Sequence, residues 1–333
     1  MEGPGRSRGA PSAARAPVAP GPGAAGKVRL TCVSMCATAS WTREEPLAGT
    51  AATAITWLLL EQPGPWGPQA LTGSRLDPVI GDALESAARG TGVRVALIRR
   101  PGRPAADAAD RPRRVYLAHT RPGHSWLREL RVRDPRQLLA LDFTRLGAGE
   151  HDGTGDPYHG DPLALVCTNG RRDRCCALLG RPLAAELAAG GGVSAWEITH
   201  IGGHRFAPTL LMLPHGYAYG RASAPLVKEV ATALREGRVV TRHCRGRSVW
   251  DRPGQAAELA VRELTGEESP DAFTVEAGGT QGAAAAVTVR HTDGRRWAVT
   301  VDQAADGPAL PASCGAAPQP QSRITVTAVR PLP

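Results

Sequence analysis

The chain has 333 residues, of which 42% are apolar and only 4% aromatic, and its formal net charge at neutral pH is +9. This length accommodates two domains, and the composition is typical of a globular protein rather than a disordered or disulfide-rich one. Nearly all the basic residues are arginines, and they alternate with acidic residues, as in "LREGR", without forming a basic stripe. The sequence therefore predicts no nucleic-acid partner.

Residues 1–26 are rich in Pro, Gly, Ala and Arg and lack the apolar segment of a secretory signal, so we expect a disordered tail. The seven cysteines are an odd number in a chain too long to need disulfides, which predicts reduced thiols and a cytoplasmic location. No run of about 18 apolar residues occurs, so neither a membrane span nor a membrane partner is predicted.

The next part of the chain, residues 27–145, has the pattern of a small α/β module. Short apolar runs bounded by turn residues predict its strands, and apolar residues at helical spacing, or an N-cap Asp followed by Pro, predict its helices. The predicted strands are 54–61, 93–99, 114–120 and 126–132, and the predicted helices are 78–90 and 134–143. Their order is strand, helix, strand, strand, strand, helix.

The Gly- and Asp-rich segment 146–161 predicts a linker, and the same order of elements then recurs within residues 162–266. The predicted strands are 162–167, 194–199, 208–213 and 216–221, and the predicted helices are 176–190, 224–237 and 253–266. A strand–helix–strand unit followed by a strand pair and a helix is typical of a thioredoxin-like fold. We therefore predict an α/β protein with two tandem thioredoxin-like modules.

Residues 267–333 are predicted to form a small C-terminal β-rich appendage. Its clearest features are a hairpin with Asp293–Gly294 at the turn and a last strand at 323–329.

Candidate ligands gather in the second module. Cys167 ends its first strand, Cys175 and Cys176 open its first helix, and His200 and His204 follow its second strand. Because the carboxyl ends of adjacent parallel strands meet at one edge of a sheet, we expect these side chains to lie close together. Gly202 and Gly203, between the histidines, would allow the backbone a close approach.

Two thiolates and two imidazoles suit either zinc or an iron–sulfur cluster. The spacing Cys167-x8-Cys176 is wider than the C-x2–4-C of a structural zinc site, which favours a [2Fe–2S] cluster. Each residue alone would be interpreted as a core thiol or a loop imidazole, and only the set of four indicates a site. The C-x3-C pair Cys32 and Cys36 has no partners nearby in sequence, so unligated thiols are favoured over a second metal or redox site, and Cys244 and Cys314 are interpreted as structural or incidental.

The segments "CTNGRRDRCCALLGRPLA" and "THIGGHRFAP" resemble the sucrase/ferredoxin-like family, and "EPLAGTA", "WLLLEQPGPWG" and "RGRSVWDRPGQAAE" extend the resemblance over most of residues 30–265. The resemblance implies a thioredoxin-like [2Fe–2S] ferredoxin domain with two cysteine and two histidine ligands. By position these are Cys167, Cys176, His200 and His204. The family's arrangement, with an Asp three residues before the second cysteine, selects Cys176 and leaves Cys175 as the alternative.

The leading functional prediction is a [2Fe–2S] protein that carries out one-electron transfer or redox chemistry with protein donors and acceptors. The alternative is a structural or interaction module in which the same Cys2His2 set binds zinc. A sucrose-cleaving hydrolase, suggested by the family name, is less favoured, because glycosidases use two carboxylates flanking the scissile bond and no such pair is marked by spacing here.

Overall fold

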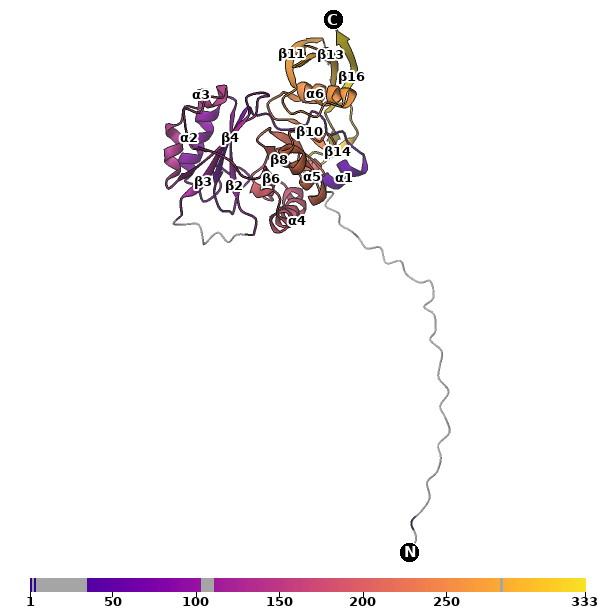
Figure 1. The fold of residues 1–333 in the computed structure, drawn as a ribbon. Coiled ribbons are helices and arrows are strands. Elements are labelled where there is room, and N and C mark those ends of the chain that lie inside the picture. Colours follow the sequence, from indigo (N-terminus) through magenta and orange to yellow (C-terminus); the bar gives the residue numbers. More distant parts are fainter. Residues whose placement is uncertain (2, 4–34, 103–110, 282–283) are drawn as a thin grey trace. The chain divides into compact units, whose positions relative to one another are not determined.

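The computed structural model describes residues 1, 3, 35–102, 111–281 and 284–333 (Figure 1). The predicted tail of residues 1–26 therefore falls outside the described residues, apart from Met1 and Gly3. The described residues from 35 onward belong to one compact unit, residues 33–333.

The principal feature of that unit is a ten-stranded mixed sheet with the order β10-β9-β8-β6-β7-β2-β1-β3-β4-β5. Its first half contains β1 (Thr56–Glu61), β2 (Val93–Arg99), β3 (Arg113–His119), β4 (Trp126–Val132) and β5 (Asp156–Pro157). Its second half contains β6 (Leu163–Cys167), β7 (Ser194–Ile198), β8 (Leu210–Leu213), β9 (Tyr217–Tyr219) and β10 (Cys244–Arg247). The strands predicted within both halves are present, with ends that shift by no more than two residues.

The two halves repeat one topology. In the first half β1 pairs parallel with β2 and antiparallel with β3, which in turn pairs antiparallel with β4. In the second half β6 pairs parallel with β7 and antiparallel with β8, which pairs antiparallel with β9. The halves join edge to edge where β2 pairs antiparallel with β7 through Ile98–Ile198 and Arg99–Glu197.

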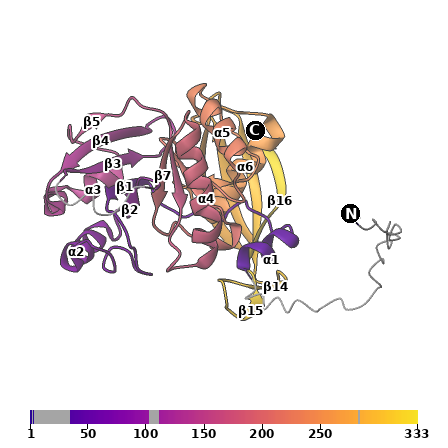
Figure 2. The same ribbon diagram turned by 90° about the horizontal axis from the view of Figure 1, so that it is seen from below.

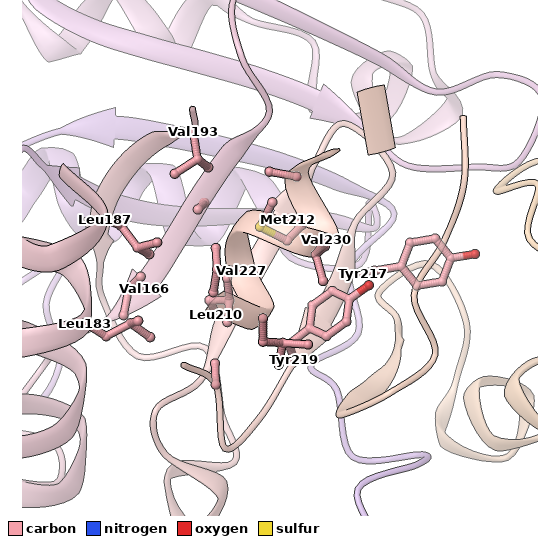
Figure 3. Close-up of a cluster of buried hydrophobic side chains, with 14 of the residues drawn as sticks. Val166, Leu183, Leu187, Val193, Leu210, Met212, Tyr217, Tyr219, Val227 and Val230 are labelled. Carbon is pink, nitrogen blue, oxygen red and sulfur yellow. The ribbon is translucent and has the colours of Figure 1, made fainter. Parts of the chain in front are cut away.

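Helices cover one face of each half. The helices over the first half are α2 (Pro78–Ala88) and α3 (Phe143–Ala148), and those over the second half are α4 (Arg174–Gly190) and α5 (Ala224–Arg235). In the second half the packing is between Val166, Leu210 and Met212 of the sheet and the helical Leu183 and Val227 (Figure 3). The opposite faces of the two halves share one apolar cluster, so β1 and β6 are buried on both sides and read as continuous apolar runs.

Residues 134–161 differ from the prediction. The helix predicted at 134–143 is a short 3-10 helix, η2 (Pro135–Ala140), capped by Asp134. Leu141 is extended, and the Asp142 side chain then accepts the backbone N–H of Arg145 and starts α3 as a separate helix. The predicted linker 146–161 includes the end of α3 and also β5, which pairs with β4.

The C-terminal part forms a separate antiparallel sheet, as its alternating pattern predicts. This sheet has the order β11-β12-β13-β16. The strands are β11 (Phe273–Gln281), β12 (Ala284–His291), β13 (Arg296–Ala304) and β16 (Arg323–Leu332), and the predicted turn at Asp293–Gly294 joins β12 to β13. A further pair, β14 (Ala309–Pro311) and β15 (Pro318–Pro320), follows β13. Helix α6 (Arg252–Thr265) packs against the four-stranded sheet, and Figures 1 and 2 show it beside β16.

A buried polar network connects α6 to the ten-stranded sheet. Tyr217 of β9 donates its hydroxyl proton to Glu258 (2.6 Å), and Arg262 donates to both Glu258 (2.9 Å) and Tyr217 (2.9 Å). The side chains of Arg262 and Glu258 are 0% and 1% exposed. Glu258 and Arg262 compensate each other's charge within α6, and their hydrogen bonds with Tyr217 tie that helix to β9.

None of the helices within the described ranges combines the length and hydrophobicity that crossing a bilayer requires.

The network predicts an unequal response to two similar substitutions. Glu258→Gln leaves the buried Arg262 guanidinium without its counter-charge and should lower the free energy of unfolding by about 3–5 kcal/mol. Glu268→Gln breaks an ion pair with Arg238 in which both side chains are about half exposed, and should cost less than about 1 kcal/mol. Urea denaturation of both variants measures the difference, and equal losses would contradict a structural role for the network.

Candidate metal centre

Three of the predicted ligands lie together at one edge of the second half of the sheet. Cys167 is the last residue of β6, Cys176 is in the first turn of α4, and His200 follows β7. Because β6 and β7 are parallel, their carboxyl ends deliver Cys167 and His200 to the same edge. His200 Nδ1 lies 3.9 Å from Cys167 Sγ and 4.0 Å from Cys176 Sγ. The ligand atoms of these three residues all lie within 4.8 Å of one another.

The fourth predicted ligand, His204, lies beside this group at the start of the short 3-10 helix η3 (His204–Phe206). Its ring centroid is 5.2 Å from that of His200. Its Nε2 lies 2.5 Å from the carbonyl oxygen of Ala312, and a carbonyl can only accept, so Nε2 carries the proton. The neutral ring then has its lone pair on Nδ1, which is buried and has no hydrogen-bond partner among the described residues.

A buried imidazole nitrogen without a partner costs free energy, and a metal ligand bond removes that cost. The donor set is therefore suited to a metal: two thiols, His200 Nδ1 facing both of them, and His204 Nδ1 with a free lone pair. The acceptor that holds the other nitrogen of His204 is the kind of partner that orients metal-binding histidines in proteins. These residues fit either zinc or a [2Fe–2S] cluster.

The two thiols share a proton: the hydrogen bond with Cys167, together with burial, raises the pKa of Cys176 and makes Cys167 the one that ionises first. Hydrogen bonds from the Cys176 thiol and from His200 hold the pKa of Cys167 well below its ordinary value, despite its complete burial. Burial lowers the pKa of His204, while the nearby Asp173 carboxylate opposes that shift. A thiolate and a neutral imidazole, the forms that ligate metals, are thus both accessible.

Two arginines, one half-buried and one fully buried, hold the loop that carries the histidines. Arg94 of β2 donates to the carbonyl oxygen of His200 (3.1 Å). Arg245 of β10, which is fully buried, donates to the carbonyl oxygen of Gly202 (3.2 Å) and to Thr50. The sequence pattern did not indicate either arginine, because their acceptors are mainly backbone carbonyls far away along the chain.

One side of the centre opens to solvent. His200 is partly exposed and borders a cavity of about 960 Å³, whose wall also includes Arg94, Asn169 and Arg172. The thiols of Cys167 and Cys176, in contrast, are 1% exposed. Solvent therefore reaches the centre from the His200 side.

Cys175 does not join the Cys167–His200 group. Its Sγ lies 3.0 Å from Cys314 Sγ and 3.6 Å from Cys36 Sγ, on another side of α4. Cys36 and Cys314, for which no role was predicted, lie with Cys175 in a second cluster. Residues 139 apart in sequence meet there, and no local pattern signals such a contact. Cys32, the partner of Cys36 in the C-x3-C pair, lies outside the described residues.

The fold and this group of side chains define an α/β protein with a candidate Cys–His metal centre. The sequence pattern of the family described as sucrase/ferredoxin-like matches residues 47–246, so the chain belongs to that family. The matched range includes all four predicted ligands and excludes Cys36 and Cys314. Comparisons with curated proteins and with solved structures give no match.

Alanine substitutions at the two glycines between the histidines are expected to differ in their cost to stability. Both have a left-handed backbone, with φ of +79° at Gly202 and +71° at Gly203, so alanine costs about 1–2 kcal/mol at either position. A Cβ at Gly202 would find its nearest neighbour at 3.9 Å, whereas one at Gly203 would overlap the buried Arg245 guanidinium. Gly203→Ala should therefore cost about 3–5 kcal/mol in total.

Chemical denaturation of Gly202→Ala and Gly203→Ala checks this expectation. Similar stabilities would mean that Arg245 can move away without loss, and that it does not fix the loop.

Proposed function

We propose that Cys167, Cys176, His200 and His204 hold a [2Fe–2S] cluster and that the protein transfers single electrons. The observation that supports this most directly is the donor set itself. His200 Nδ1 faces two buried thiols, and His204 Nδ1 is buried with no partner in the described part of the chain while its Nε2 is held by the Ala312 carbonyl. Family membership supports the same reading, since the family description includes ferredoxin.

A cluster is favoured over zinc by the spacing of the two thiols. Cys167 and Cys176 are separated by eight residues, wider than the C-x2–4-C typical of a structural zinc site. With two thiolates and two neutral imidazoles the oxidised cluster carries no net charge, so it accepts an electron more readily than a four-cysteine cluster.

The chain's own residues would prepare the site for that role. Ala312 fixes the tautomer of His204, and Arg94 and Arg245 hold the backbone of the histidine loop. Burial of Cys167 and Cys176 keeps water from the thiolates. The partly exposed His200, at the cavity wall, is the point at which a redox partner can come near.

We further propose that each half of the large sheet is a thioredoxin-like module, one within residues 27–145 and the other within 162–266. The support is the repeated order β2-β1-β3-β4 and β7-β6-β8-β9, with one parallel pair and two antiparallel pairs in each. Helices on one face of each half agree with that layout.

The proposed partners are redox proteins that supply and accept the electron. Arg171, Arg172 and Arg174 are exposed beside the centre and would favour an acidic docking surface. The six cysteines in the described part of the chain are free thiols, in keeping with a reducing, cytoplasmic compartment.

Metal analysis of the purified protein tests the cluster. We expect about two iron and two sulfide ions per chain, a brown colour and bleaching by dithionite. Cys176→Ser should lose at least about nine-tenths of the iron, since a ligand is removed. Cys175→Ser should keep the iron, because the Cys175 thiol faces Cys314 and Cys36 instead.

The same experiment separates the alternatives. If the protein is colourless and contains zinc that Cys176→Ser loses, the site is a Cys2His2 zinc site and not a [2Fe–2S] cluster. Iron lost only in Cys175→Ser would reverse the assignment of the second cysteine ligand.

A further inference from the structure

A second set of metal-binding side chains lies outside the Cys–His centre. Cys36 is the first residue of α1 (Cys36–Thr42), Asp173 and Cys175 are at the start of α4, and Cys314 is in the loop between β14 and β15. One ligand atom from each lies within 4.8 Å of those of the other three. Three segments distant in sequence therefore place three thiols and one carboxylate together.

We propose that Cys36, Cys175, Cys314 and Asp173 form a zinc site that is separate from the Cys–His centre. Zinc bound to thiolates at about 2.3 Å in a tetrahedron places neighbouring sulfurs about 3.8 Å apart. Cys36 Sγ lies 3.6 Å from Cys175 Sγ and 3.7 Å from Cys314 Sγ, and 3.8 Å from either carboxylate oxygen of Asp173. The Cys175–Cys314 pair, at 3.0 Å, must lengthen to fit this tetrahedron.

Backbone groups support the sulfurs as they do in metal sites. The backbone N–H of Ala37 lies against Cys175 Sγ, and that of Cys36 lies against Cys314 Sγ. Such donors stabilise thiolates and orient them toward a metal. Ala207 and Leu179 pack against the same cluster, so the Cys36 and Cys175 sulfurs are buried in largely apolar surroundings, while Cys314 is partly exposed.

Hydrogen bonds hold Asp173 in position to serve as the fourth ligand. One carboxylate oxygen accepts the backbone N–H of Cys175 (2.9 Å), and the other accepts that of Cys314 (2.9 Å). Each oxygen keeps a lone pair, because a carboxylate has about four acceptor positions. The side chain is 1% exposed and has His204 Nε2 3.7 Å from one oxygen, and an ionised group so deeply buried is stabilised further by a full positive charge beside it. A zinc ion would supply that charge.

A disulfide between Cys175 and Cys314 is the competing interpretation of the short Sγ–Sγ distance. It would use two of the four groups and leave the Cys36 thiol and the Asp173 carboxylate buried beside it. A disulfide joins only two cysteines, so it does not explain why Cys36 Sγ lies at nearly the same distance from both other sulfurs. Zinc uses all four groups.

The site can be tested in the full-length chain, purified under reducing conditions without added metal, by measuring zinc and iron per chain. We expect about one zinc ion in the wild type. Cys36→Ser and Cys314→Ser should each lower the zinc content at least about tenfold while keeping most of the iron. Cys244→Ser is the matched control, because Cys244 is equally buried but lies in β10, away from both groups.

Cobalt provides a measurement that does not depend on variants. Wild-type protein freed of zinc and titrated with Co²⁺ should develop the intense absorption of a tetrahedral thiolate site, and Cys314→Ser should weaken it. Zinc content unchanged in both serine variants would overturn the proposal. Zinc-free wild type with a Cys175–Cys314 disulfide found by mass spectrometry would also overturn it. Zinc lost in Cys167→Ser but not in Cys36→Ser would place the ion at the Cys–His centre, and would contradict both the cluster and this site.

Discussion

The backbone N–H of Cys175 donates a hydrogen bond to the Asp173 side chain, which fixes where α4 begins, and the rest of the candidate metal-binding region depends on this contact. Successive residues of an α-helix point about 100° apart, so the start of the helix sets the directions of Cys175 and Cys176. Cys176 faces the shared interior with Cys167 and His200, while Cys175 faces Cys36 and Cys314. Two adjacent cysteines, which would compete for one metal in a loop, are thereby assigned to different groups.

The large sheet supplies the other half of this arrangement. Because β6 and β7 are parallel neighbours, Cys167 and the histidine loop leave the sheet at one edge, opposite the first turn of α4. The loop then turns back through Gly202 and Gly203, and Arg94 and Arg245 hold its carbonyls from either side. Arginine suits this task because its planar guanidinium offers several donors in fixed directions.

Much of the fold was predictable because buried strands are apolar runs and their turns carry Gly, Pro and Asp. The positions of Cys167, His200 and His204 at strand ends were predictable for the same reason. The pairing of β2 with β7, which unites the halves, was not, since it involves two residue pairs and leaves no periodic pattern. The second thiol cluster was also beyond local reasoning, because Cys36 and Cys314 approach Cys175 only through the packing of the N-terminal helix and the C-terminal loop.

Ala312, in the C-terminal segment, accepts a hydrogen bond from His204. A segment outside the candidate centre therefore orients one of its candidate ligands. The loop that offers this carbonyl also carries Cys314, two residues later, so the orientation of His204 and the geometry of the thiol cluster are mechanically linked. The family match ends at residue 246, before this loop begins. The acceptor that orients His204 therefore comes from a part of the chain outside the matched range, so a change in that loop alone can alter the orientation of this candidate ligand.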